Sequence, residues 1–299
     1  MGTLTRRILI TGAGGFTGQH ACRHFAAAGM QVTAALRKKG VNPAGCSAVF
    51  GDLTKRDDVK RMVEESEPDW VLHVAGHNSV AASWLDPASF LETNLMSTIY
   101  LLDALRNHSR CRVLIAGSML NFALTDPPIP QHPYSLSKTL QVLASRSWGA
   151  LFGQQILIAQ PSNLIGPGRS TGICGLLARK IAKVERGEDH QPFRLSSFVE
   201  ERDYLDVRDA VTAYSYLLEK GESGQVYALG SGRNRSLGDI VHAFQAMTEC
   251  DLPLEAGQIP GYVPPPPVPI TAIKAFGWEP KISFEQSLAD TLQYYRNEV

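Results

Sequence analysis

The sequence has no excess of charge of either sign. Its 29 lysines and arginines balance its 29 aspartates and glutamates, so the formal net charge is zero. A strongly positive overall field, of the kind that attracts nucleic acids or anionic membranes, is therefore lacking. We expect neither a nucleic acid nor a membrane as a partner.

Cysteine is scarce, and the N-terminal stretch lacks a long apolar run. The five cysteines lie far apart and form no C-x-x-C pair, a pattern untypical of disulfide frameworks and structural metal sites. We expect free thiols, no metal and a cytoplasmic location. The stretch MGTLTRRILITGAGG reaches glycine before an apolar run of signal-peptide or membrane-spanning length forms, so neither segment is expected there.

What the sequence does contain is a glycine-rich turn in an informative place. The apolar run RILIT at 7–11 is typical of a strand, GAGGFTG follows at 12–18, and a helical pattern comes next. In this context Gly12 permits a tight turn, Gly15 lets the backbone approach a pyrophosphate, and Gly18 allows helix and strand to pack closely. The pattern predicts a dinucleotide site, and a glycine-rich turn without a ligand is the alternative.

The end of the second predicted strand, residues 31–36, indicates which dinucleotide is bound. An NAD site normally has an Asp or Glu there to bind the ribose hydroxyls. This strand is followed instead by Arg37, Lys38 and Lys39. Because cationic side chains suit a 2′-phosphate, we predict NADP(H) as the cofactor. A solvated basic loop is the alternative.

Strand-like and helix-like segments alternate through the first half of the chain. Further strands are expected at 48–50, 70–76, 112–118 and 155–160. Thr54 is expected to cap the helix that follows the first of these. The order predicts an α/β fold with a Rossmann-type, doubly wound parallel sheet. We expect an NADP-binding domain at 1–160 and a smaller C-terminal α/β substrate domain at 161–299, from which the chain can re-enter the sheet.

Ligands bind at the carboxyl ends of the strands in such a sheet, and several candidate residues fall at the expected strand ends. With the glycine turn and the basic segment, the candidate cofactor-binding residues are Gly12, Gly15, Phe16, Thr17, Gly18, Arg37, Lys38, Asp52, Leu53, Ala75, Gly76, Tyr134 and Lys138.

The segment YSLSK at 134–138 predicts acid–base chemistry. Tyr134 and Lys138 are four residues apart, so they share one face of a helix. A neighbouring ammonium favours the phenolate and lowers the pKa of the tyrosine, which can then exchange a proton with a carbonyl or alcohol oxygen. Ser118, just past a predicted strand, can hold the same oxygen. A hydride transfer between nicotinamide and a C–O carbon needs this set of groups.

As a set, these motifs resemble the extended short-chain dehydrogenase/reductase family, also called the NAD-dependent epimerase/dehydratase family. The resemblance covers nearly the whole chain and is strongest to nucleotide-sugar ketoreductases of the GDP-4-keto-6-deoxymannose reductase type. The residues that carry it are TGAGGFTG, GDLT, HVAG, ETNLMSTIYLLDAL, Ser118, YSLSK, SNLIGPG, RDYLDVRDAV and GWEP.

The resemblance implies a function and further roles. Ser118, Tyr134 and Lys138 would be catalytic, and Lys138 would also hold the nicotinamide ribose. Asn163 and Arg202 resemble contacts to the diphosphate-nucleoside half of a nucleotide-sugar, and Ser79 is a candidate sugar contact. These residues are expected to bind a small-molecule substrate, a nucleotide-sugar. A homodimer is expected by analogy, formed through the apolar helices at 90–105 and 136–151.

The expected activity is the NADPH-dependent reduction of a keto group, at C4 of a nucleotide-activated 4-keto-6-deoxy sugar. Sugar 4,6-dehydratases of this family place acidic residues just after the catalytic serine or threonine, where this chain has Met119 and Leu120, which cannot transfer protons. A nucleotide-sugar epimerase and a non-catalytic NADP-sensing protein are the alternatives. The proline-rich segment 260–269 also lacks the arginine that often helps the family bind a nucleotide diphosphate.

Overall fold

The structure is a computed structural model that describes residues 5–38, 40 and 42–298. The chain forms two compact units. Unit 1 comprises the residues up to Gln160 together with Val211–Tyr227, and unit 2 comprises Pro161–Ala210 and the residues from Ala228 onward. The substrate domain expected at 161–299 is therefore interrupted by a segment that belongs to unit 1.

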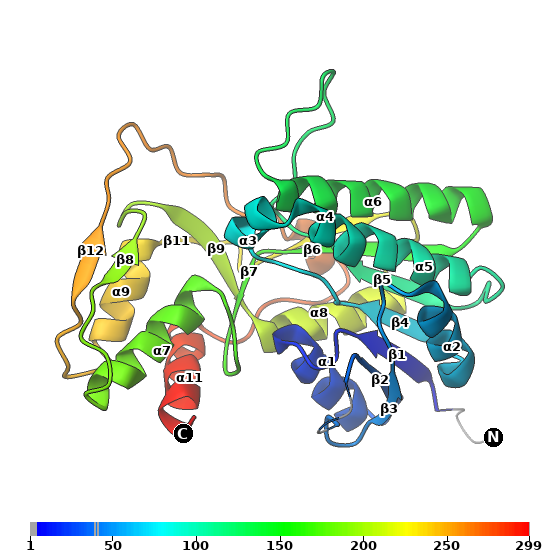
Figure 1. Cartoon of the computed structure of the whole chain (residues 1–299), viewed down its shortest axis with the longest axis horizontal. Helices are drawn as coiled ribbons and strands as arrows, with labels where there is room; N and C mark the ends of the chain where they lie inside the picture. Colours follow the sequence, from blue (N-terminus) through cyan, green and yellow to red (C-terminus); the bar gives the residue numbers. More distant parts are fainter. Residues whose placement is uncertain (1–4, 39, 41, 299) are drawn as a thin grey trace. The chain divides into compact units, whose positions relative to one another are not determined.

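A seven-stranded sheet forms the centre of unit 1, with the strand order β10-β6-β5-β4-β1-β2-β3 (Figure 1). All neighbouring pairs among strands β1 to β6 in this order are parallel. The order reverses between β1 and β4, which is the switch point of a doubly wound sheet, so the predicted Rossmann-type fold is confirmed. The strands are β1 (Arg7–Thr11), β2 (Gln31–Leu36), β3 (Ser47–Phe50), β4 (Trp70–His73), β5 (Arg112–Ala116), β6 (Gln155–Pro161) and β10 (Val226–Leu229).

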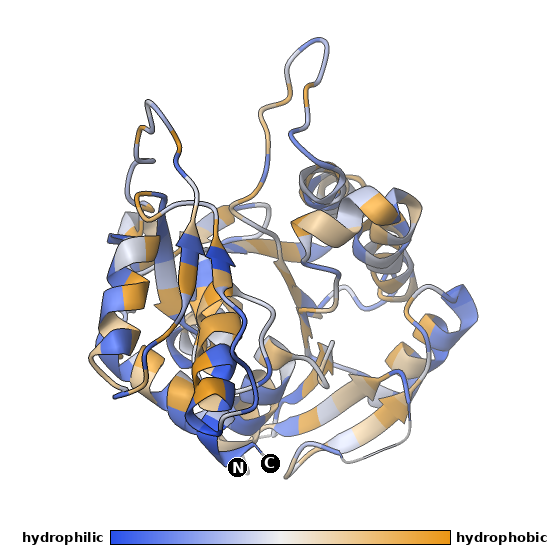
Figure 2. Ribbon diagram, turned by 60° about the vertical axis from the view of Figure 1, so that its left-hand side comes forward, coloured by the Kyte–Doolittle hydropathy of each residue, from blue (hydrophilic) through white to orange (hydrophobic). Residues whose placement is uncertain are grey.

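Burial explains why these short segments become strands. The central strands β1, β4, β5 and β6 are almost wholly buried, as expected for a parallel sheet covered on both faces. Figure 2 shows hydrophobic colour along the strands and alternating hydrophobic and hydrophilic residues around the helices. The helices are α1 (Phe16–Ala27), α2 (Arg56–Ser66), α3 (Val80–Leu85), α4 (Pro87–Phe90), η1 (Leu91–Met96), α5 (Ser97–Ala104), α6 (Pro133–Phe152) and α8 (Val207–Lys220).

Two local expectations are wrong. The single helix expected at 90–105 is interrupted by η1, one turn of π-helix that contains Asn94. Thr54 does not cap α2: the capping residue is Lys55, which makes no side-chain bond. The Thr54 hydroxyl donates instead to the carboxylate of Asp52, at 2.9 Å.

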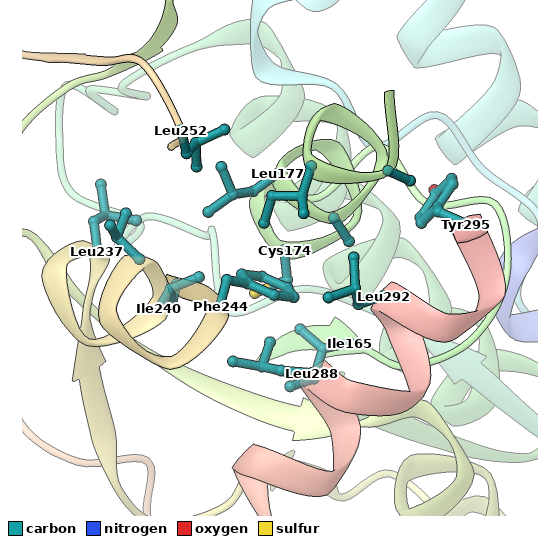
Figure 3. Packing of buried hydrophobic residues seen from close by; sticks show 14 of the residues in the cluster. Ile165, Cys174, Leu177, Leu237, Ile240, Phe244, Leu252, Leu288, Leu292 and Tyr295 are labelled. Atoms are coloured by element: carbon teal, nitrogen blue, oxygen red, sulfur yellow. The ribbon is translucent and has the colours of Figure 1, made fainter. Parts of the chain in front are cut away.

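Unit 2 has its own core and two small sheets. Its three-stranded sheet has the order β11-β9-β7, and its two-stranded sheet pairs β12 with β8. Figure 3 shows side chains of α7, α9 and α11 directed into one apolar cluster that includes Leu177, Phe244 and Leu292. Its elements are β7 (Asn163–Ile165), α7 (Ile173–Glu185), β8 (Phe193–Leu195), β9 (Glu201–Asp206), β11 (Asn234–Ser236), α9 (Leu237–Gln245), β12 (Leu254–Ala256), α10 (Thr271–Lys274) and α11 (Phe284–Asn297).

Candidate active site

The glycine turn after β1 packs closely against neighbouring backbone and leads into helix α1. Gly12 has φ +68°, and a Cβ there would lie 2.8 Å from the Cα of Ala75. A Cβ on Gly18 would overlap the carbonyl oxygen of Gly12. Gly15 begins helix α1 without a side-chain cap, so the first backbone N–H groups of the helix, from Phe16 onward, are available to an anion. The turn therefore fits the pyrophosphate of a dinucleotide.

The basic segment after β2 is exposed in the part that the structure describes. Arg37 and Lys38 both face solvent, whereas Lys39 lies outside the described residues. Asp52, after β3, is half-buried and accepts from the backbone N–H of Thr54 at 2.9 Å. That bond is the main reason why the pKa of Asp52 is lowered, and the nearby charge of Arg37 acts in the same direction. Strand β2 thus ends in cations that a phosphate group can reach.

The catalytic candidates Ser118 and Tyr134 lie together in unit 1. Tyr134 is 6% exposed, and its phenol lies close enough to the Ser118 hydroxyl for the serine to influence its pKa. The Ser118 Oγ also accepts from the backbone N–H of Leu120 at 3.0 Å, which holds the serine in place. Burial raises the pKa of Tyr134, and the nearby Ser118 hydroxyl lowers it by less. The predicted lowering of this pKa is therefore wrong: burial decides its direction, and the phenol stays protonated at neutral pH.

Tyr134 owes its position to the first turn of α6. His132 caps this helix: its Nδ1 accepts from the backbone N–H of Ser135 at 2.9 Å, and the Ser135 hydroxyl lies 3.3 Å from the backbone N of His132. The imidazole stacks on the Tyr134 ring, while Phe90 meets that ring edge-on. The helix cap and the two ring contacts thus hold the Tyr134 side chain in place.

Lys138 is buried one helical turn further on. Its Nζ donates to the backbone oxygen of Ala116 at 2.7 Å and to the Oε1 of Gln141 at 2.7 Å. Burial lowers the pKa of Lys138 to about 7. An ammonium has three N–H donors, so these two acceptors leave one donor for a ligand.

The π-helical turn η1 places a buried amide next to Gly76. The Asn94 side chain accepts from the backbone N–H of His77 at 2.8 Å and donates to the His77 oxygen at 3.1 Å and to the Ser137 hydroxyl at 2.9 Å. A Cβ on Gly76 would lie 2.8 Å from the Asn94 Oδ1. Asn94 therefore fixes the segment after β4 against α6, close to the Lys138 amino group.

The remaining candidates have structural partners as well. The Ser79 Oγ accepts from the backbone N–H of Ala82 at 3.1 Å and so caps α3. In unit 2, strands β7 and β9 pair in parallel with Asn163 opposite Tyr204, and the Asn163 side chain donates to the Asp203 oxygen at 3.0 Å. Arg202 is paired with Glu200 and its side chain is 41% exposed.

Sequence reasoning missed Gln141, which holds the Lys138 amino group, and Thr98, which holds Gln141. The available signal was helical spacing. Gln141 lies three residues after Lys138 and seven after Tyr134, so all three share one face of α6. Among residues 5–38, 40 and 42–298, no group of three or more metal-binding side chains occurs, and no helix is long and apolar enough to cross a bilayer.

A glycine turn at the switch point of a parallel sheet defines a Rossmann-type dinucleotide-binding fold. The sequence profile of the NAD dependent epimerase/dehydratase family matches residues 8–230. The chain belongs to this family, which confirms the resemblance found in its motifs.

Individual relatives perform several reactions. The chain is 29% identical to the GDP-6-deoxy-D-mannose reductase of Pseudomonas aeruginosa, with 99% of each protein covered. It is 30% identical to a dTDP-glucose 4,6-dehydratase of Xanthomonas campestris, with 83% of this chain and 78% of the relative covered.

Solved structures share the fold. The structure of RMD from Pseudomonas aeruginosa complexed with NADPH matches with a TM-score of 0.84 and 28% identity over the whole of both chains. A UDP-glucose 4-epimerase from Thermus thermophilus, in complex with NAD, matches with a TM-score of 0.85 and 23% identity over 98% of this chain and 100% of that one.

Because the amino group of Lys138 is buried, we predict that the free energy of unfolding depends on pH. Its folded-state pKa, about 7, lies below the ordinary value for lysine. The unfolded chain therefore binds more protons between about pH 7 and pH 10, and the wild-type protein gains stability across that window. Relative to wild type, Lys138→Met should lose on the order of 3 kcal/mol between pH 7 and pH 10.

Urea denaturation of both proteins across this window measures the difference. Lys60→Met, which removes an exposed lysine from α2, shows the effect of deleting a surface charge. A constant difference between Lys138→Met and wild type from pH 7 to pH 10 would contradict the prediction.

Proposed function

We propose that the protein is an NADPH-dependent reductase that reduces the C4 keto group of a nucleotide-activated 4-keto-6-deoxy sugar. The observation that carries the proposal is the buried phenol of Tyr134, close to Ser118 and on the same helix face as Lys138. The similarity to a GDP-6-deoxy-D-mannose reductase over nearly the full length supports the same substrate class.

The residues of unit 1 divide the binding of a dinucleotide among them. In this proposal the glycine turn and the start of α1, Gly12 to Gly18, hold the pyrophosphate. Arg37 and Lys38 hold the 2′-phosphate. The segments after β3 and β4 line the remaining site through Asp52, Leu53, Ala75 and Gly76. The bound nicotinamide would supply the hydride.

The protein's own groups then manage the proton. Tyr134 donates its phenolic proton to the keto oxygen as the C–O group becomes an alcohol. The Ser118 hydroxyl holds that same oxygen. The free N–H of Lys138 holds a ribose hydroxyl, and the ammonium charge stabilises the phenolate that Tyr134 leaves behind. A phenol whose pKa is raised by burial suits this direction of reaction, because it remains a proton donor at neutral pH.

The residues after Ser118 separate this proposal from a dehydratase. Met119 and Leu120 are 36% and 40% exposed and carry no group that removes or returns a proton. An epimerase would oxidise and re-reduce one centre with the same Ser118, Tyr134 and Lys138. Stoichiometric consumption of NADPH distinguishes a reductase from an epimerase, which returns its cofactor unchanged.

Two further roles belong to the proposal. Ser79, Asn163 and Arg202 bind the nucleotide-sugar, which requires Arg202 to exchange part of its pairing with Glu200 for a phosphate. The protein also forms a homodimer through α5 and α6. The exposed Leu143, Leu151 and Phe152 on α6 give that helix an apolar surface to bury.

The preference for NADPH should depend on the basic segment. Arg37→Ala combined with Lys38→Ala is expected to weaken NADPH binding about tenfold to a hundredfold, since charge-assisted bonds to the 2′-phosphate are lost. NADH binding should stay nearly unchanged. Calorimetric titration with each cofactor measures both affinities, and Arg23→Ala on α1 removes a comparable exposed cation. An equal loss for both cofactors would refute a 2′-phosphate role.

Removal of the Tyr134 hydroxyl should stop turnover. Tyr134→Phe is expected to lower kcat by about 100-fold to 10,000-fold, because the proton donor is gone. NADPH affinity should be retained, and Tyr100→Phe, which alters a half-buried tyrosine on α5, should behave as wild type. The assay follows NADPH oxidation with 4-keto-6-deoxy nucleotide-sugars. If the biological effect of the protein survives in Tyr134→Phe, the non-catalytic NADP-sensing protein would be favoured over the reductase.

The identity of the nucleotide is the point on which the substrate class depends. We expect NADPH to bind, and one of GDP, UDP, dTDP or CDP to bind more tightly than the others when titrated into the NADPH complex. Calorimetry with each diphosphate gives the order. NADPH binding without any nucleotide preference would remove the nucleotide-sugar from the proposal.

A further inference from the structure

A chain of buried polar groups leads away from the Lys138 amino group. The Gln141 Oε1 accepts from Lys138, and the Gln141 Nε2 donates to the Thr98 Oγ1 at 2.8 Å. The His73 Nε2 lies 2.9 Å from the same Thr98 oxygen, and the His73 Nδ1 lies 2.7 Å from the Thr11 Oγ1. Gln141, Thr98, His73 and Thr11 are all 0% exposed. The chain joins α6, α5, β4 and β1.

The number of protons on Thr98 and His73 decides which group donates in each hydrogen bond of this chain. The Thr98 hydroxyl donates to the backbone oxygen of Asn94 at 2.7 Å, so its oxygen must accept from its other two partners. His73 is neutral at neutral pH, because burial, with a smaller effect of Lys138, lowers its pKa to about 3. Its single proton therefore lies on Nε2 and points to Thr98, while Nδ1 accepts from the hydroxyl of Thr11.

This proton order locks the side-chain amide of Gln141. If the amide turned over, its oxygen would face the Thr98 oxygen, whose only proton is already given to Asn94. Its NH₂ group would at the same time face the donors of Lys138. Acceptor would then face acceptor and donor would face donor in a fully buried site, so this orientation is unfavourable. The carbonyl of Gln141 can therefore point only at Lys138.

A long lysine side chain needs such a support. Its four-carbon stem has many rotamers, and a buried ammonium is costly unless acceptors surround it. We propose that Gln141 is a positioning residue for Lys138, which aims the remaining N–H of the amino group into the site and is itself held by Thr98 and His73. The chain ends at Thr11, the residue before the glycine turn, so the lysine and the turn share one rigid frame.

The assignment of Lys138 to a catalytic site rests on the proposed function, but the contact with Gln141 can be tested without it. Among the described residues, the charge of Lys138 acts on His73 of β4, and Tyr134 lies one turn before Lys138 on the same face of α6. Selective labelling of lysine with ¹³C at Cε allows the titration of Lys138 to be followed by NMR in the enzyme without cofactor or substrate. The signal that disappears in Lys138→Met assigns the resonance.

Gln141→Met keeps the volume of the side chain and removes its oxygen. The midpoint for Lys138 should fall by about one to two pH units, because a bond that favours the charged form is lost. The matched control is Gln154→Met. Gln154 is also a buried glutamine of unit 1, but its side chain donates to the Leu102 oxygen, away from the site. Its removal should leave the Lys138 midpoint in place.

An unchanged midpoint in folded Gln141→Met, or an equal shift in Gln154→Met, would overturn the proposal. If Gln141→Met does not fold, the Lys138 midpoints of Thr98→Val and Thr98→Ser test the positioning role instead. The valine removes the oxygen that orients Gln141 and should shift the midpoint downward, whereas the serine retains the oxygen and should restore it. The same midpoint in both variants would contradict a positioning role.

The two proposals fail separately. A shifted titration in an enzyme that reduces no nucleotide-sugar would uphold the role of Gln141 and remove the reductase. An unchanged Lys138 midpoint in Gln141→Met, together with sugar reduction by the wild type, would uphold the reductase and refute the positioning role of Gln141.

Discussion

The burial of one positive charge is the constraint on which the polar interior of unit 1 depends. The Lys138 amino group lies between the end of β5 and helix α6, where it receives the Ala116 oxygen and the Gln141 oxygen as partners. Burial still lowers its pKa to about 7. The charge is therefore only partly compensated by the protein, and this leaves the lysine receptive to a ligand that offers further acceptors or negative charge.

That constraint accounts for features that would otherwise be unrelated. The π-helical turn η1 carries Asn94, whose backbone oxygen takes the proton of Thr98 and whose side chain binds the backbone of His77. A regular helix would shift these two groups relative to each other, and π-helical turns are frequent at functional sites. His73, at the end of β4, completes the set as a neutral bridge between Thr98 and Thr11.

Much of this molecule could be predicted from its sequence. The strands of a covered parallel sheet are short apolar runs, and β1 and β2 were predicted at their observed residues because glycine or charge ends them abruptly. Spacing placed Tyr134 and Lys138 on one helix face. Three features could not be predicted: the interruption at η1, the role of Thr54 and the partners of Lys138. The partners of Lys138 depend on contacts between elements distant in sequence, such as Thr98 with Gln141, which local patterns do not reveal. Thr54 bonds to Asp52, only two residues before it, and a pattern of residue types does not decide between that bond and a helix cap.

The same interplay explains why the pKa of Tyr134 was predicted in the wrong direction. Helical spacing shows that an ammonium can lie near the phenol, but it does not show that the phenol is 6% exposed or that the amino group is bonded elsewhere. Burial then raises the pKa of Tyr134 and lowers that of Lys138. Without ligand, the pair favours a neutral phenol beside an amine that is easily deprotonated. Acceptors and phosphate charge brought by a dinucleotide would raise the pKa of the lysine again, and its ammonium would then stabilise the phenolate. In the proposed reaction, the dinucleotide would thus complete the acid–base set, because the protein alone compensates the buried charge of Lys138 only in part.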